Sequence, residues 1–90
     1  MAAYPYNAEQ GQTDLMAAAY NGDVEEVVRI LECPCDIDAQ DSHGMTALMY
    51  AALEGHAEVL GSLVEGGAGL EFLSHHRFTA LTYAARGGHS

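Results

Sequence analysis

The chain has 90 residues, and its mixture of 49% apolar and 18% charged residues is typical of one small globular domain rather than a disordered segment. It contains 13 acidic residues but only three arginines and no lysine, so its formal net charge is −10. This charge argues against binding to nucleic acid, which needs clustered basic residues, and against binding to an anionic membrane surface.

The first 12 residues, MAAYPYNAEQGQ, read as a lead segment before the domain. They lack the basic and apolar regions of a signal peptide, and no apolar run approaches the roughly 20 residues of a membrane-spanning helix. The two cysteines, Cys33 and Cys35, are separated by one residue, so they could form only a strained disulfide. We therefore expect a protein of the reducing cytoplasm that does not enter a membrane.

The first predicted element is a short helix that follows Thr13. Its sequence, TDLMAAAYNGD, recurs in similar form 33 residues later as TALMYAALEGH from Thr46, and again as TALTYAARGGH from Thr79. Threonine is a frequent helix N-cap, because its hydroxyl accepts a hydrogen bond from an N–H group of the first turn. Apolar residues at i, i+3 and i+4 give each copy one buried face. These residues are Leu15, Ala18 and Ala19; Leu48, Ala51 and Ala52; and Leu81, Ala84 and Ala85.

A second helix is predicted after the glycine that ends each of the first two short helices. Its apolar stripe consists of Val24, Val27, Val28 and Leu31 in the first copy, and of Ala57, Leu60, Leu63 and Val64 in the next. The segment Gly66–Gly69 follows a helix rather than opening one, so we read it as a helix C-cap and not as a phosphate-binding loop.

Turn-forming residues follow the second helix, with Asp41-Ser42-His43-Gly44 as a predicted tight turn. Each unit is thus helix, turn, helix and projecting hairpin-like loop. One unit cannot bury its apolar stripe alone, so neighbouring units must stack. We expect one array over residues 13–90, divided into units at 13–45 and 46–78 and a partial unit at 79–90.

With its 33-residue period and its recurring Thr, Leu, Ala and Gly positions, the sequence resembles the ankyrin repeats from Thr13 to its end. The resemblance is most specific in TALMYAALEGHAEVLGSLVEGGA. The resemblance implies an all-α solenoid of stacked helix–turn–helix units with projecting hairpin loops. The sequence also departs from the family pattern. Met16, Met49 and Thr82 replace a histidine that bonds between units, Pro34 replaces a glycine after the second helix, and Ser74 and Arg77 replace the Asp and Gly of a loop. The last pair puts the regular turn of the second loop in doubt.

Few residues suggest chemistry. Cys33, Cys35 and His43 could be imagined around zinc, but the paired ligand spacing of a zinc site is absent. Cys35 also aligns with a small buried alanine of the family, and His56 and His89 align with a histidine that supports the turn between helices. No motif for a nucleophile, a metalloprotease or a phosphate site is present. We therefore predict no catalytic residue, no metal and no cofactor.

The resemblance implies a non-catalytic module that binds a protein partner through its loop tips and inner-helix face. The matching positions here are Gln40, Ser42, His43, Met45, Leu53, Glu54, His75, His76 and Phe78, with Tyr20, Asn21 and Leu73 beside them. Met45 and Phe78 are apolar residues at a position that is exposed in the family, and the alternative is that one or both pack back against the adjacent loop. The net charge suggests a partner with some positive charge. The alternatives are a fragment of a larger ankyrin protein with its effector domain elsewhere, and a Cys/His metal-binding protein or enzyme.

The third copy contains only the first helix of a unit. We expect Leu81, Ala84 and Ala85 to pack back against the second unit, while the surface that a second helix would have covered stays open. The chain is then either a truncated piece of a longer array, or it associates with itself through this C-terminal end.

Overall fold

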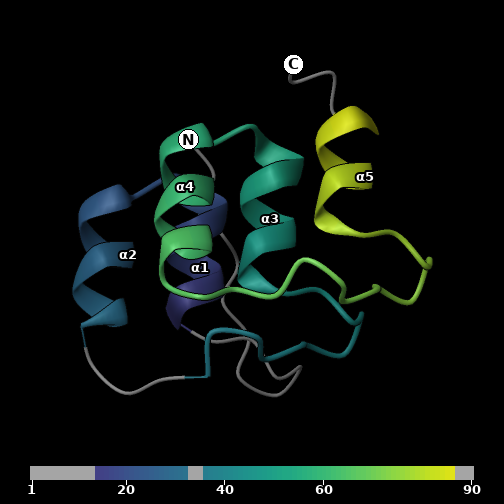
Figure 1. Cartoon of the computed structure of the whole chain (residues 1–90), viewed down its shortest axis with the longest axis horizontal. Helices are drawn as coiled ribbons and strands as arrows, with labels where there is room; N and C mark the ends of the chain where they lie inside the picture. Colours follow the sequence, from purple (N-terminus) through teal and green to yellow (C-terminus); the bar gives the residue numbers. More distant parts are fainter. Residues whose placement is uncertain (1–13, 33–35, 87–90) are drawn as a thin grey trace.

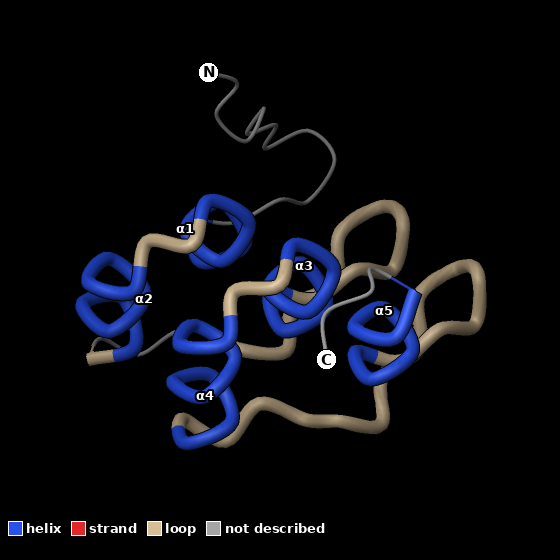
Figure 2. The backbone as a smooth tube through the Cα atoms, turned by 90° about the horizontal axis from the view of Figure 1, so that it is seen from above, coloured by secondary structure: helices blue, strands red, loops and turns tan. Residues whose placement is uncertain are grey.

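The computed structural model describes residues 14–32 and 36–86, which form five helices and no strand. The helices are α1 (Asp14–Asn21), α2 (Val24–Leu31), α3 (Ala47–Glu54), α4 (Ala57–Glu65) and α5 (Ala80–Arg86). They lie in two layers, with α1, α3 and α5 in one row and α2 and α4 in the other (Figures 1 and 2). The expected all-α solenoid of helix–turn–helix units is confirmed.

Thr46 shows why α3 begins where it does. Its backbone is extended, and its hydroxyl accepts a hydrogen bond of 3.3 Å from the N–H of Met49. The N–H of Thr46 in turn donates to the sulfur of Met49 at 3.5 Å. Met49 therefore closes the first turn of its own helix and is buried, whereas the family's histidine at this position was expected to bond between units.

Left-handed glycines end the first helix of both complete units. Gly22 has a φ of 74° and Gly55 a φ of 76°, a conformation that glycine adopts without steric cost. In the first unit Asp23 then caps α2 by accepting a bond of 3.2 Å from the N–H of Glu26. The chain can thus reverse within two residues and place α2 beside α1.

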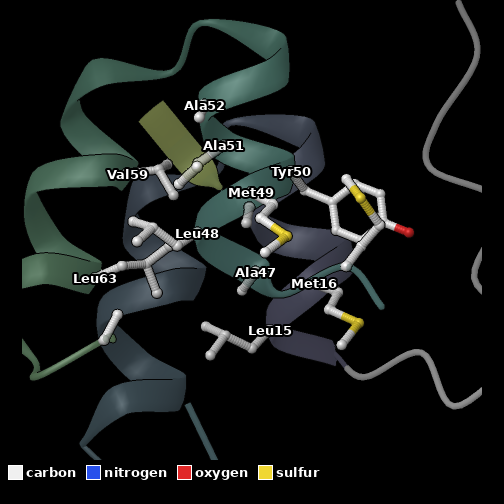
Figure 3. Packing of buried hydrophobic residues seen from close by; sticks show 14 of the residues in the cluster. Leu15, Met16, Ala47, Leu48, Met49, Tyr50, Ala51, Ala52, Val59 and Leu63 are labelled. Carbon is white, nitrogen blue, oxygen red and sulfur yellow. The ribbon is translucent and has the colours of Figure 1, made fainter. Parts of the chain in front are cut away.

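The core lies between the two layers and is centred on α3, which contacts α1, α4 and α5 (Figure 3). Ala19 and Ala51 are completely buried, so small side chains allow the helices of one row to approach closely. The predicted faces of α1 and α3 are confirmed, since all six of their residues are buried. Val59, which the predicted stripe of α4 omits, is also fully buried.

The expected packing of α5 is wrong in two of its three residues. Leu81 is 80% exposed and Ala85 is exposed, while Ala84 is half-buried. Ala80 and Tyr83 are the buried residues of this helix. The reason is geometric: the described chain has no helix beside α5 in the outer row, so the face that carries Leu81 has no neighbour.

Several expectations concern Thr13, Cys33, Pro34, Cys35 and His89, which lie outside the described residues. Within the described ranges, no helix has the length and apolar character needed to cross a membrane. The unit boundaries at residues 13, 46 and 79 stay predictions.

Candidate protein-binding surface

The first projecting loop, residues 40–45, is built around Asp41. The N–H of Gly44 donates to the carbonyl oxygen of Asp41 at 2.9 Å, which confirms the predicted turn. The carboxylate of Asp41 is buried and accepts hydrogen bonds of 2.9 Å from the N–H groups of His43 and Met45. It also accepts a hydrogen bond from the hydroxyl of Tyr50 in α3. The loop is therefore anchored to the inner helix row by one buried side chain.

The second loop, residues 73–78, forms the same turn despite its different residues. The N–H of Arg77 donates to the carbonyl oxygen of Ser74 at 2.8 Å, and Arg77 adopts a left-handed φ of 64°. The hydroxyl of Ser74 accepts from the N–H groups of His76 at 3.3 Å and Phe78 at 3.4 Å. The doubt raised by Ser74 and Arg77 is therefore resolved: the turn persists, with serine in place of aspartate.

Direct hydrogen bonds hold the two loops side by side. The side-chain amide of Gln40 donates to the carbonyl oxygen of Gly44 at 3.0 Å and to that of Leu73 at 3.1 Å. The N–H of His75 donates to the carbonyl oxygen of His43 at 2.9 Å. The exposed amide of Gln40 thus also has a structural role, because it joins the first loop to the second.

The tips of the loops present polar side chains on a fixed backbone. Ser42, His43, His75 and His76 are all exposed, and they occupy adjacent positions on the two joined loops. Backbone hydrogen bonds determine the position of each tip, so these side chains are displayed at low conformational cost. A preorganised surface of this kind loses less entropy when a partner binds.

The expected exposure of Met45 is wrong. Met45 is only 7% exposed and belongs to the hydrophobic core, so its side chain is not available at the surface. The backbone of Met45 is held by two bonds to Asp41, since its carbonyl oxygen accepts from the N–H of Asp41 and its N–H donates to the carboxylate. The second loop is hydrogen-bonded to the first, and the alternative of a side chain that packs back holds for Met45.

Phe78 occupies the equivalent position one unit later and is only half-buried. Its ring packs edge-on against that of Tyr83, with centroids 5.5 Å apart, and lies 6.0 Å from the ring of His76. The guanidinium carbon of Arg86 lies 4.8 Å from the centroid of Phe78, within cation–π range. Sequence reasoning missed Arg86 and Tyr83, although the recurrence of Tyr50 as Tyr83 at the 33-residue period was a signal.

Two of the expected contact residues are not brought to the loops. Leu53 is half-buried and Glu54 is exposed, and both lie at the C-terminal end of α3. The first loop joins the opposite, N-terminal end of this helix (Figure 1). A partner that contacts the loops as well as Leu53 and Glu54 must therefore extend along α3 from its N-terminal to its C-terminal end.

The histidines provide no metal centre in the described part of the chain. His56 has the structural role expected of it, because its Nε2–H donates to the carbonyl oxygen of Tyr20 in the preceding unit at 2.9 Å. No group of three or more histidine, cysteine or acidic side chains is arranged to hold a metal ion among the described residues.

Charge is unevenly distributed along the sequence. All 13 acidic residues lie at or before Glu71, whereas residues 72–90 contain two of the three arginines and three of the five histidines. The second loop and α5 therefore form a region without acidic residues in a strongly acidic chain. A partner that contacts Arg77 or Arg86 would meet a local charge opposite in sign to the net charge.

The comparisons with known proteins agree with the architecture. A family model described as "Ankyrin repeats (3 copies)" matches residues 15–90. No curated protein matches the chain. Proteins built from such repeats are generally modules for protein–protein interaction and are typically non-catalytic.

Proposed function

Because the chain belongs to the ankyrin-repeat family, we propose that it is a non-catalytic module that binds a protein partner through the tips of its two loops. The observation that carries this proposal is the pair of joined loops, which display His43 and His75 on a backbone fixed by hydrogen bonds. Such a surface offers polar and aromatic contacts to a partner.

The contact surface that we propose consists of Gln40, Ser42, His43, His75, His76 and Phe78, with Arg86 added beside Phe78. Leu53 and Glu54 would extend it along α3 toward the other end of the inner row. Met45 supports the surface from below, since it is buried. A cytoplasmic location belongs to the same proposal and rests on the sequence arguments alone.

The local charge suggests what part of the partner lies at the second loop. Arg77 is exposed on this loop, Arg86 packs over Phe78, and no acidic residue follows Glu71. We therefore expect the partner to place acidic or aromatic side chains here. This local expectation differs from the positively charged partner suggested by the net charge of −10.

The test is affinity capture from the native cell with three forms of the chain. The first is unchanged, the second carries His43→Ala, His75→Ala and His76→Ala, and the third carries Glu25→Ala on the exposed side of α2. Proteins held by the first and third forms but lost from the second would support the loop tips as the site. Equal capture by all three folded forms would contradict it.

A further inference from the structure

An apolar groove of about 300 Å³ lies between α4 and α5. Its walls are Leu48 from α3, Leu60 and Val64 from α4, Leu70 from the loop, and Thr79, Ala80, Leu81 and Ala84 around α5. Leu81 is 80% exposed and Leu70 60%, so both project at its edges. A smaller hollow of about 190 Å³ shares Leu60 and Ala84 and continues the groove toward His56.

Internal repetition shows what shape fits this groove. One unit earlier, α4 itself packs against α2 and α3, and it buries Val59 and Leu63 completely there. The groove lies beside α4 and α5 in the way that α4 lies beside α2 and α3, one unit further along the stack. It therefore matches an apolar helix surface rather than a polar loop or a small polar ligand.

The opposite end of the stack is polar at the matching positions. The second unit has Ala47 and Val59, which are buried, and His56, which bonds to Tyr20 of the first unit. The equivalent residues of the first unit, 33 positions earlier, are Asp14, Asp23 and Glu26. These three residues line a separate shallow hollow on α1 and α2. Head-to-tail stacking of two copies would press three carboxylates against the apolar groove, which costs free energy because their charges lose water.

Contact between two C-terminal ends avoids this cost. Residues 72–86 contain no acidic residue, although the rest of the described chain is strongly acidic. None of the residues that line the groove is charged, so two copies that meet there bury no carboxylate of the lining. An apolar knob, Leu81, and an apolar groove lie together on this face, which is what a contact between identical surfaces requires.

We propose that two copies of this chain form a twofold-symmetric dimer in which Leu81 of each copy enters the groove of the other. The contact develops the self-association expected from the sequence and gives it a surface and a symmetry. It uses a different face from the exposed histidines of the loop tips, so partner binding and dimerisation can succeed or fail independently.

Sedimentation equilibrium of the 90-residue chain over a wide concentration range tests the proposal. The average mass should rise from 9.6 kDa and level off at twice that value. Leu81→Asp should weaken association by about 100-fold or more, because it removes two leucine side chains from the dimer and buries two charges. Leu73→Asp is the matched control, since Leu73 is exposed and does not line the groove.

Four results would overturn the proposal. A mass of one chain at all concentrations would show that the groove holds no second copy. Growth beyond two copies, or weaker association in Asp14→Lys, would indicate head-to-tail contact through the acidic end. Equal association of Leu81→Asp and Leu73→Asp, with circular dichroism showing both folded, would place the contact elsewhere.

Discussion

The hydroxyl of Tyr83 donates a hydrogen bond of 2.7 Å to the hydroxyl oxygen of Ser74, nine residues earlier in the chain. The same bond recurs 33 residues before, where the hydroxyl of Tyr50 donates to the carboxylate of Asp41. In both units a buried tyrosine of the inner helix thus anchors the turn of the preceding loop. The loops that we propose as the binding surface depend on these two residues for their position.

Removing the tyrosine hydroxyls should destabilise the two loops unequally. Tyr50→Phe leaves one carboxylate oxygen of Asp41 without this donor, whereas Tyr83→Phe leaves a neutral serine hydroxyl. We expect Tyr83→Phe to lower the free energy of unfolding by about 1 kcal/mol, and Tyr50→Phe to lower it by about 2 kcal/mol or more. Urea denaturation measures both values. An equal loss in the two variants would contradict the argument from charge.

The turn between α1 and α2 should not accept a side chain at Gly22. Its φ is 74°, and an added Cβ would lie 2.7 Å from the ring of His56. Gly22→Ala should therefore lower the free energy of unfolding by more than about 1 kcal/mol. Gly61→Ala is the control. Gly61 lies inside α4, and beyond its chain neighbours and the nearby backbone of α4 an added Cβ would meet no atom within 4 Å, so this change should raise stability by about 0.5–1 kcal/mol. Thermal unfolding followed by circular dichroism distinguishes the two signs.

Equivalent positions in the two loop turns should respond in opposite directions. Arg77 adopts a φ of 64°, which costs a residue with a side chain roughly 1 kcal/mol, so Arg77→Gly should raise the melting temperature. Gly44 has a φ of 76°, and an added Cβ would lie 2.9 Å from the backbone nitrogen of His75. Gly44→Ala should therefore lower the melting temperature. A fall in the melting temperature of Arg77→Gly would show that the arginine side chain makes a compensating contact.

Met45 should behave as a core residue and not as a surface contact. Met45→Ala removes a buried side chain and should lower the free energy of unfolding by about 2 kcal/mol or more. His43→Ala, two residues earlier on the exposed tip, should change it by less than about 0.5 kcal/mol. Chemical denaturation of the two variants provides the measurement. If Met45→Ala were as stable as His43→Ala, the burial of Met45 would not matter for folding.

Much of the fold could be predicted from the sequence because its signals are local. The 33-residue spacing of Thr13, Thr46 and Thr79 fixed the repeating unit, and the i, i+3, i+4 pattern identified the buried faces of α1 and α3. Thr46, which begins α3, and the left-handed Gly55, which ends it, each act within one turn of that helix. These features need no knowledge of what lies beside the helix.

Burial at equivalent positions could not be predicted, because it depends on the neighbour. Leu48 and Leu81 share one position of the repeat, yet Leu48 is 2% exposed and Leu81 80%. Met45 and Phe78 differ in the same sense, since the second loop lies against the first and the described residues contain no loop beyond the second. The sequence by itself determined which side of each helix is apolar. Only the tertiary structure decided which apolar sides are covered, because the free energy of burial comes from the surface that packs against them.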